Sequence, residues 1–409
     1  MSAPNHSPSA TSIILRNQAF VLFWFSRIST TIAYQMLAVA VGWQIYAITG
    51  SAFYLGLVGL AQFLPMFILT LVVGHVADRY NRKLIICLCQ FIQGAGTLVL
   101  AVGSYADWLN TENILIIVSV LGAARAFEGP TMQAFLPNLV PTELFPRAVA
   151  WATSSTQTAA IIGPAFGGLL YLAGPTTVYS VAGALFLAAS LLIILIKVKQ
   201  ALPVGGLPSL QSLFAGIAFI RSKPAILGAI SLDLFAVLLG GATALLPVYA
   251  RDILAVGPQG LGILRAAPAV GALFMSVFLA HYSLRHNVGR TMFIAVIIFG
   301  IATTGFALST SFVLSLAALA VLGAANVISV VIRWSLVQME TPDEMRGRVS
   351  AVNSLFIGTS NQLGDFESGL TAAWFGVVPA VLIGGIGTII VAVMWIRLFP
   401  ELARVDTLK

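Results

Sequence analysis

Long apolar segments recur along nearly the whole chain, and short polar gaps separate them. Segments of roughly 20 apolar residues are long enough to cross a bilayer as helices. Backbone groups in lipid must be paired within their own segment, which excludes open strands. The pattern predicts an all-α membrane protein with about twelve transmembrane helices in two sets of six. The first set is expected near 18–48, 51–77, 84–105, 113–136, 147–172 and 176–196, and the second near 224–250, 260–280, 289–308, 311–336, 348–375 and 377–398.

A polar stretch rich in lysine, proline and glycine divides the two sets. Within it, the apolar spacing from Leu210 to Ile220 predicts a short interfacial helix. The start of the chain is polar, lacks Lys and Arg before Arg16, and is typical of a disordered tail rather than a cleaved signal peptide. The expected domains are a disordered cytoplasmic tail at 1–17, a six-helix bundle at 18–196, a cytoplasmic linker at 197–223, a second bundle at 224–398 and a cytoplasmic tail at 399–409.

The charges are distributed unevenly between the two sides of the predicted helices. Most Lys and Arg lie in the gaps on one side, whereas the gaps on the other side hold Arg251 with Asp107, Glu112 and Asp252. The positive-inside rule therefore places both termini in the cytoplasm. With 59% hydrophobic and 9% charged residues, the net charge of +7 is explained by topology, and we expect no nucleic-acid partner.

The two sets of helices repeat one another in sequence. Residues 121–124 and 322–325 both read Leu-Gly-Ala-Ala, a shift of 201 residues, and the same shift aligns Gly163 with Gly364 and Gly168 with Gly369. Earlier in each set, 55–56 and 261–262 both read Leu-Gly, a shift of 206. The repeat predicts two parallel, pseudo-symmetric bundles related by an axis along the membrane normal, which is a transporter architecture.

The gap after the second helix reads GHVADRYNRK at 74–83. It resembles the loop signature of the major facilitator superfamily, and Asn81 stands where a glycine is usual, which suggests a left-handed backbone there. The resemblance implies that this loop forms a cytoplasmic gate between the halves, and the second-half copy, with Leu284 and Arg285, is degenerate. The gate residues are Gly74, Asp78, Arg79, Arg82 and Lys83.

The fourth and fifth helices carry two further motifs. Arg125 and Glu128 lie three residues apart in the fourth helix and are expected to pair, either for function or only to neutralise each other. The fifth helix reads GPAFGG at 163–168, which resembles the antiporter motif of exporters of this superfamily. Small residues four apart allow close helix packing and a proline can kink the helix. We expect a hinge for rocking formed by Gly163, Pro164, Gly167 and Gly168.

Other intramembrane charges are functional candidates because burying them is costly. The eleventh helix holds Asp365 and Glu367, and Asp365 shares a face with Asn361 and Gly369, which favours it for a cavity position. Arg27 and Asp233 occupy equivalent positions in the two halves and are predicted to pair. The proton-coupling candidates are Glu128, Asp233, Asp365 and Glu367, and the candidates for the substrate cavity are Arg27, Tyr34, Gln35, Arg125, Asn326 and Arg333.

The whole-chain pattern is similar to the bacterial drug and siderophore exporter branch of the superfamily. The resemblance implies a transporter of the bacterial inner membrane that exports a small organic molecule by alternating access, coupled to protons. The arginines would suit an anionic or catecholate substrate. Rival interpretations on the same fold are a nutrient importer, a lipid flippase and a metal-ion exporter; a membrane sensor or scaffold is the non-transport alternative.

The chain shows no phosphate-cradling loop, zinc spacing or nucleophile elbow. We therefore predict that it is not an enzyme and binds no metal and no cofactor, with the proton gradient as its energy source. Its expected partners are a small-molecule substrate, protons and the lipid bilayer, and it is expected to be a monomer.

Overall fold

The computed structural model describes residues 14, 16–197, 210–282 and 286–407. At 70–72, 74, 75, 77, 78, 210–213, 343, 344, 351, 354 and 355 it describes the backbone alone. Much of the predicted N-terminal tail, most of the linker, and Leu284 and Arg285 therefore lie outside the described residues.

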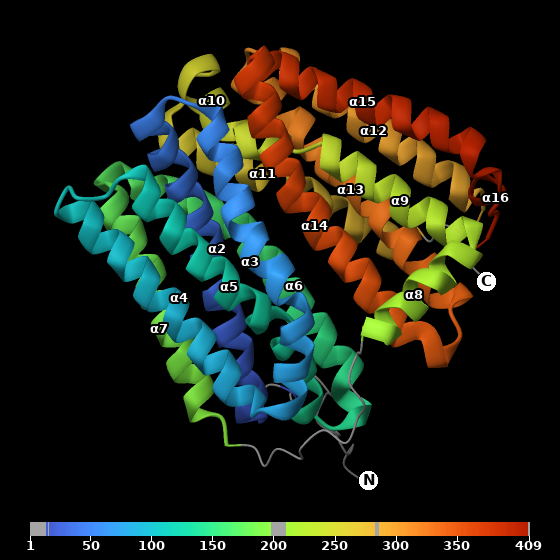
Figure 1. The fold of residues 1–409 in the computed structure, drawn as a ribbon, viewed down its shortest axis with the longest axis horizontal. Coiled ribbons are helices and arrows are strands. Elements are labelled where there is room, and N and C mark those ends of the chain that lie inside the picture. Colours follow the sequence, from blue (N-terminus) through green and yellow to red (C-terminus); the bar gives the residue numbers. More distant parts are fainter. Residues whose placement is uncertain (1–13, 15, 198–209, 283–285, 408–409) are drawn as a thin grey trace, which may run out of the picture.

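Twelve long helices make up most of the described chain, as the sequence predicts, and the described residues form no strand. The first bundle contains α2 (Gln18–Thr49), α3 (Ala52–Arg79), α4 (Arg82–Tyr105), α5 (Thr111–Phe135), α6 (Phe145–Leu170) and α7 (Pro175–Leu195). The second contains α9 (Pro224–Leu239), α11 (Gly257–His281), α12 (Val288–Leu308), α13 (Phe312–Glu340), α14 (Asp343–Phe375) and α15 (Val377–Leu398). Figure 1 shows the bundles as two separate groups of long helices.

Short elements connect the long helices. They are η1 (Leu136–Asn138), η2 (Thr142–Leu144), η3 (Tyr171–Ala173), α8 (Leu210–Ser222), η4 (Ala242–Leu245), α10 (Leu246–Val248), the π-helix η5 (Tyr249–Ile253) and α16 (Pro400–Ala403). We call the end of the molecule where α3 and α7 finish, and where α8 and α16 lie, the linker end. The other end, where α2 finishes and η5 lies, is the opposite end (Figure 1).

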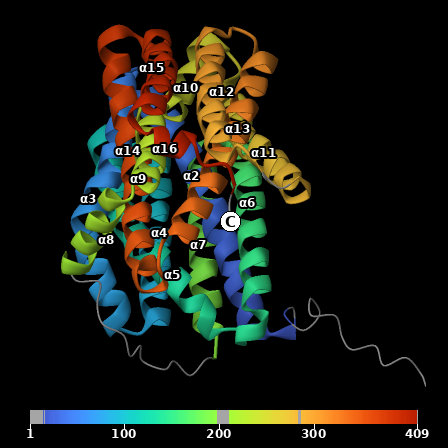
Figure 2. The ribbon, with the colours of Figure 1, turned by 90° about the vertical axis from the view of Figure 1, so that its right-hand side faces the viewer.

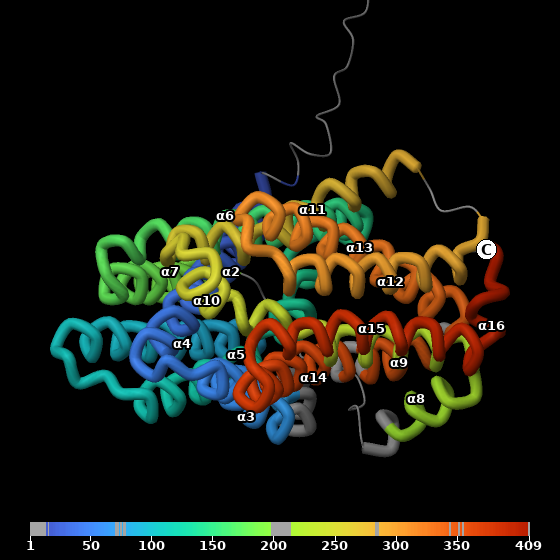
Figure 3. The backbone as a smooth tube through the Cα atoms, turned by 90° about the horizontal axis from the view of Figure 1, so that it is seen from above, coloured from blue at the N-terminus to red at the C-terminus, as the bar shows by residue number. Residues whose placement is uncertain are grey.

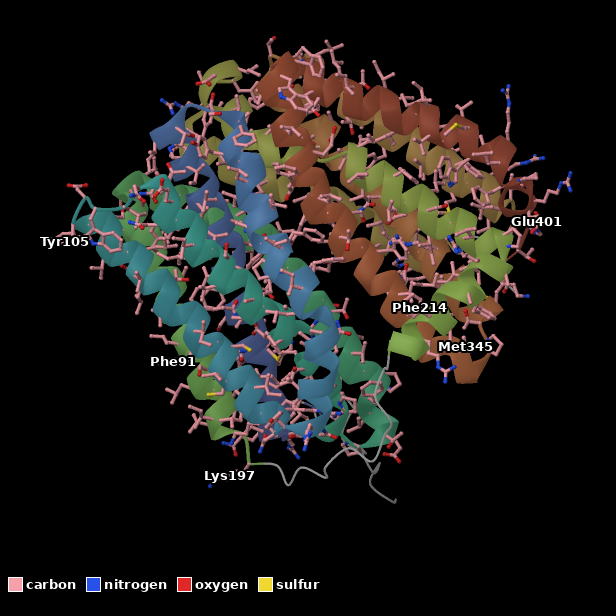
Figure 4. All side chains as sticks on the ribbon, viewed as in Figure 1. Phe91, Tyr105, Lys197, Phe214, Met345 and Glu401 are labelled. Carbon is pink, nitrogen blue, oxygen red and sulfur yellow. The ribbon has the colours of Figure 1, made fainter. Side chains whose placement is uncertain are left out.

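The surface of the bundles is strongly apolar. Large hydrophobic side chains such as Phe91 and Tyr105 of α4 are exposed and point away from the protein (Figure 4). Ten helices in the described part are long and apolar enough to cross a membrane. An exposed apolar surface of this extent fits lipid, not water, so the chain is a multi-pass membrane protein.

The remaining two long helices, α6 and α14, are more polar and stand at equivalent positions of the repeat. They pack between the bundles: α6 contacts α11 of the second bundle, and α14 contacts α3 of the first. Figures 2 and 3 show these two interfaces on opposite sides of the molecule. Polar residues are tolerated in α6 and α14 because much of each helix faces protein instead of lipid.

Polar side chains and glycine define several helix ends. The Asn17 side chain accepts a hydrogen bond from the Phe20 N–H at the start of α2. Gly50 caps the other end of α2, and its positive φ of 60° suits a residue without a side chain. Asn81 caps α4 by accepting from the Lys83 and Leu84 N–H groups. The expected left-handed backbone at Asn81 is therefore wrong, because its φ is −62° and it serves as an N-cap.

The predicted continuous helix at 224–250 is also wrong. α9 finishes at Leu239, and the chain continues through η4, α10 and η5. Gly240 and Gly241 lie at the break, and glycine weakens a helix because it loses the most backbone freedom on folding. A Cβ atom at Gly241 would lie 2.5 Å from the Gly364 oxygen, so the broken segment packs its backbone directly against α14.

The predicted linker helix is present as α8. A Cβ at its Gly216 would lie 3.0 Å from the Arg348 oxygen, so this face packs against α14, and Ile220 is buried. Phe214 is exposed (Figure 4). One face of α8 therefore packs on the protein, and the apolar side chain of Phe214 is exposed on the outside. The position of α8 at the membrane surface stays a prediction.

The chain after α15 docks onto the second bundle. The Val288 N–H donates to the backbone oxygen of Asp406, and the Gly289 N–H donates to that of Val405. The Asn287 N–H donates to the Asp406 carboxylate at 2.9 Å. This backbone hydrogen bond, together with His286 and Arg290, lowers the pKa of Asp406. The C-terminal segment thus caps the first turn of α12, where N–H groups lack helical partners.

Glycine contacts confirm the two-fold repeat. A Cβ at Gly369 of α14 would lie 2.5 Å from the Gly56 Cα of α3, and one at Gly168 of α6 would lie 3.0 Å from the Gly262 Cα of α11. These are the glycine pairs that the shifts of 201 and 206 align. Each inter-bundle interface is therefore a close backbone contact near the opposite end.

Gly369→Ala is expected to overpack the α3–α14 interface and to lower the free energy of unfolding by about 1–3 kcal/mol. The measurement is thermal unfolding of the purified protein, followed by tryptophan fluorescence. Gly305→Ala in α12 is the matched control, because a Cβ there meets nothing within 4 Å, and alanine favours a helix. Equal unfolding curves for Gly369→Ala and the wild type would contradict the close contact.

Candidate transport cavity

A cavity of about 380 Å³ lies between the two bundles. Its walls come from α2, α3, α4, α5 and α7 of the first bundle and from α11, α14 and the segment after α9 of the second. Most of the lining is apolar. The polar lining residues are Tyr34, Gln62, Gln93, Arg125, Arg265, Asn361, Gln362 and Asp365.

Arg125 and Tyr34 form the first polar group of this cavity. The Arg125 guanidinium lies 3.3 Å from the centre of the Tyr34 ring, a close cation–π contact. The Tyr34 hydroxyl donates to Gln62 Oε1 at 2.9 Å. Both residues line the cavity, so their predicted positions agree with the structure.

Arg265 of α11 supplies a second guanidinium to the cavity, which the sequence reasoning did not include among the site residues. It donates weakly to the Ala38 oxygen of α2, at 3.4 Å, and so reaches across to the first bundle. It is close enough to Asp365 for their charges to interact. A lone arginine in an apolar helix was the signal that could have identified it.

Asp365 lies at the boundary between the bundles, where α14 crosses α3. A Cβ at Gly59 of α3 would lie 2.8 Å from the Asp365 Cβ. Asp365 and Asn361 line the central cavity and also a second cavity of about 450 Å³, which Asn326 lines as well. Asp365 therefore lines the central cavity as predicted, whereas Asn326 lines the second cavity and not the central one.

Glu367, the other acid of α14, lines neither of these cavities. It is half-buried and accepts a hydrogen bond from the Thr371 hydroxyl at 2.8 Å. Gln35 also lines neither cavity, since its Cβ lies 2.7 Å from the position of a Cβ at Gly163 of α6. The structure therefore assigns Gln35 to helix packing, in contrast to its predicted cavity position.

Glu128 is buried beside the cavity instead of pairing with Arg125 as predicted. It accepts hydrogen bonds from the side-chain amides of Gln90, at 3.0 Å, and Gln93, at 2.6 Å. Arg125 turns to the Tyr34 ring. Because Gln93 lines the cavity, Glu128 lies one residue behind the cavity wall.

The predicted pair between Arg27 and Asp233 is not formed. Arg27 of α2 donates to the Thr156 hydroxyl of α6 at 3.0 Å and lies within electrostatic range of Glu128. Asp233 of α9 forms a buried ion pair with Arg333 of α13. Both charges therefore find a partner inside their own bundle, because the first and fourth helices of each bundle bring their charged faces together.

Arg333 is consequently not a cavity residue, in contrast to its prediction. Its side chain is 3% exposed, and its Nε and the nearby Ser329 hydroxyl are buried without a hydrogen-bond partner. A small space lined by Asp233 and Asn326 adjoins the second cavity, which Asn326 also lines. The ion pair thus lies behind the second cavity much as Glu128 lies behind the first.

The gate motif is described in part. Arg82 donates to the Ala134 oxygen at 2.9 Å, and Lys83 donates to the Ile194 and Ile196 oxygens, each at 2.8 Å. These cations satisfy carbonyl groups near the ends of α5 and α7, where helix carbonyls lack partners. Arg79 is exposed. At Gly74 and Asp78 the structure describes the backbone alone, so the latch between halves stays a prediction.

The small residues of α6 pack on both bundles. Gly163 and Gly167 lie against Gln35 and Met36 of α2, within the first bundle. On the other side, a Cβ at Gly262 of α11 would lie 2.4 Å from the Pro164 oxygen. The predicted hinge motif is therefore a close-packed contact between the bundles, and the rocking motion stays a prediction.

Polar contacts join the bundles at the opposite end. The Tyr46 hydroxyl of α2 donates to the Asp252 carboxylate of η5. The Arg251 guanidinium donates to the backbone carbonyl oxygen of Tyr46 at 3.1 Å and lies 5.4 Å from the centre of the Tyr46 ring. Hydrogen bonds to charged groups are among the stronger ones, so this cluster holds α2 against η5.

Tyr46→Phe is expected to loosen the opposite end and to admit reagents to the cavity from that side. A hydrogen bond to a charged group contributes about 1.5–3 kcal/mol, so labelling should accelerate by roughly tenfold or more. The measurement is the rate at which a membrane-impermeant thiol reagent labels Val58→Cys, a cavity residue, with Cys87 and Cys89 replaced by serine. Tyr54→Phe, at an exposed tyrosine of α3, is the control. Equal rates for Tyr46→Phe and the wild type would contradict the prediction.

Comparison with known proteins agrees with this architecture. The enterobactin exporter EntS of Escherichia coli O1:K1 is 27% identical to this chain over 405 residues, which cover 96% of the chain and 94% of EntS. EntS of Citrobacter koseri is 28% identical over the same shares of both proteins.

Solved structures share the fold at lower identity. A bacterial homologue of the human lysosomal transporter Spinster, inward-facing and unoccupied, has a TM-score of 0.71 and 15% identity, and the match covers 97% of this chain and 98% of the homologue. The nucleoside transporter NupG has a TM-score of 0.69 and 16% identity, with coverage of 93% and 99%. These structures show the fold alone.

The family model described as transmembrane secretion effector matches residues 9–408, which is nearly the whole chain. With its two six-helix bundles and the cavity between them, the chain belongs to the transmembrane secretion effector family of major facilitator transporters.

Proposed function

We propose that this transporter exports a small organic molecule by alternating access, and that protons moving inward drive the export. The observation that carries the proposal is the cavity between the bundles, where Asp365 lies beside Arg265 and opposite Arg125 and Tyr34. The similarity to named enterobactin exporters supports the direction of transport.

The charges of the cavity favour an anionic substrate. Arg125 and Arg265 outnumber Asp365 among the charged lining residues. The cavity therefore has a positive balance while Asp365 is ionised, and more so once it is protonated. Guanidinium groups bind oxyanions with paired hydrogen bonds and stack on aromatic rings. A catecholate or another aromatic anion, such as a siderophore, suits both properties.

Asp365 is the proposed proton carrier. In export driven by inward proton movement, Asp365 takes up a proton on the outer side as the substrate leaves. It releases that proton to the cytoplasm before the next substrate binds beside Arg265. Because Asp365 packs on α3 and Arg265 reaches α2, both belonging to the first bundle, rocking of the bundles changes the surroundings of both groups. Glu128 and the Asp233–Arg333 pair, which lie behind the cavity walls, are secondary candidates.

The orientation follows from the charges of the gaps. Arg79, Arg82, Lys83 and Lys197 lie at the linker end, and the positive-inside rule assigns this end to the cytoplasm. In this orientation the Tyr46–Asp252 cluster closes the cavity on the outer side of the bacterial inner membrane.

A substrate panel in inverted membrane vesicles tests the proposal. In these vesicles export appears as uptake, and an acidic interior supplies the gradient. The panel contains catecholates, cationic drugs, nutrients, a fluorescent lipid and divalent metal ions. We expect uptake of an aromatic anion that stops when a protonophore collapses the gradient. Uptake that is indifferent to the gradient would overturn proton coupling, and accumulation of a nutrient in intact cells would indicate an importer instead.

A further inference from the structure

An open groove of about 730 Å³ lies on the outside of the molecule, along the α6–α11 interface and beside α13. All its lining residues are hydrophobic, and they include Ala165, Phe166, Ile263, Val270, Ala317 and Ala320. Phe166 and Leu169 at its rim are each about half exposed, at 45% and 55%. Figures 2 and 3 show α6, α11 and α13 together on one side of the molecule.

The groove lies within the membrane-spanning part of the chain. It reaches from Leu169, next to the end of α6, inward to Ile161. Eight helical residues correspond to a depth of about 12 Å at 1.5 Å per residue. The mouth is at the opposite end, so the groove opens to the half of the bilayer on that side, where the surrounding molecules are lipid acyl chains.

Three alanines of the groove have larger residues at the matching positions beside the other inter-bundle interface. The shift of 201 places Phe366 opposite Ala165 and Ile116 opposite Ala317, and the shift of 206 places Leu60 opposite Ala266. At the α3–α14 interface the chain therefore supplies bulky apolar side chains of its own, Phe366 and Leu60, with the exposed Ile116 of α5 beside it. At the α6–α11 interface alanines leave that volume open, and an empty apolar groove forfeits dispersion contacts.

The groove is also continuous with the contact on which the bundles meet. Ala165, in its wall, lies next to Pro164, whose oxygen would lie 2.4 Å from a Cβ at Gly262 of α11. A hydrocarbon chain in the groove would touch both bundles at once. It would bury apolar surface of both in the arrangement seen here.

We propose that the α6–α11–α13 groove binds one acyl chain of a membrane phospholipid, from the half of the bilayer at the opposite end. The acyl chain fills the volume that the side chains of Phe366, Leu60 and Ile116 fill on the other side of the molecule. This site is separate from the central cavity and does not depend on the transported substrate.

Photolabelling with two phospholipids tests the site. Both are phosphatidylethanolamines, one with a diazirine at the tip of an acyl chain and one with a diazirine near the glycerol. The protein is reconstituted with each lipid, irradiated and mapped by mass spectrometry. We expect labels to concentrate on the groove, with the tip probe near Ile161 and Val270 and the other probe near Leu169 and Val313.

Two single variants fill the groove from different helices. Ala165→Phe copies the residue of the other interface, and Ala317→Phe adds bulk from α13. Each is expected to lower groove labelling at least about fivefold. Ile116→Phe, at the exposed position that matches Ala317, is the control and should leave labelling unchanged. Each variant is first checked for its chromatographic profile and thermal unfolding.

Three outcomes would overturn the proposal. One is labelling spread evenly over the lipid-facing helices. The second is groove labelling that persists in both folded variants. The third is a dimer that Ala165→Phe converts to monomer with no change in labelling, which would assign the groove to a second copy of the chain.

Discussion

Asp365→Asn is expected to abolish gradient-driven transport while the protein stays folded and still binds its substrate. Asparagine has nearly the same shape as aspartate but carries no proton to release, so it mimics the protonated state permanently. Substrate exchange without a gradient involves no net proton movement and should persist, because Arg125 and Arg265 still line the cavity. Gradient-driven uptake in inverted vesicles should fall by more than about tenfold, which corresponds to at least 1.4 kcal/mol of lost coupling.

Glu367→Gln is the matched control for this experiment. Glu367 lies on the same helix, two residues away, but lines neither cavity and contacts Thr371 instead. It should transport like the wild type. Loss of gradient-driven uptake in Glu367→Gln and its retention in Asp365→Asn would assign the proton to Glu367. Loss of exchange together with uptake in Asp365→Asn would indicate a binding role for Asp365 instead of proton transfer.

Arg333→Met is expected to destabilise the second bundle severely. It keeps most of the side-chain volume but leaves Asp233 charged, buried and without its partner. Removing one member of a buried ion pair costs about 3–5 kcal/mol, because the remaining charge is uncompensated. Thermal unfolding, followed by tryptophan fluorescence, is a suitable measurement, since Trp395 lies beside α9 and donates to Ser231.

A double variant separates the charge from the packing. Asp233→Leu combined with Arg333→Met removes both charges, and apolar replacement of a buried pair is often neutral or stabilising. The double variant should therefore unfold close to the wild type, whereas Arg397→Met, at an exposed arginine of α15, should have little effect. If Arg333→Met unfolds like the wild type, or if the double variant is no better than the single one, the ion pair does not stabilise the fold as inferred.

The two charge pairs illustrate how far the repeat could be followed in sequence. Arg27 and Asp233 occupy equivalent positions, which invited the prediction that they pair with each other across the axis. In the structure each faces the fourth long helix of its own bundle: Arg27 lies near Glu128, and Asp233 binds Arg333. The charges are reversed between the bundles, but only Asp233 and Arg333 form an ion pair, whereas Glu128 accepts hydrogen bonds from Gln90 and Gln93. Equivalent positions need not touch, because the symmetry axis separates them.

The cavity shows a similar limit. The sequence identified Arg125 and Asp365 as candidates because charged groups are costly in apolar helices, and Tyr34 as an aromatic residue of the first helix. It placed Arg333 in the cavity and left Arg265 out, although both are intramembrane arginines. Their roles differ because α13 turns Arg333 toward Asp233, whereas α11 turns Arg265 toward the other bundle. Helix rotation about its axis depends on every neighbour and has no signal in one sequence.

The sequence by itself determined the helices, their repeat and the small-residue contacts between bundles. Each of these depends on short-range patterns: the length of an apolar run, the charges of a gap, or residues at helical spacing such as Pro164 and Gly168. Only the tertiary structure decided the break at Gly240 and Gly241, the partners of the buried charges, and the groove left by Ala165. These depend on which backbone lies within a few ångströms, and residues that meet there, such as Asp233 and Arg333, are 100 positions apart in the chain.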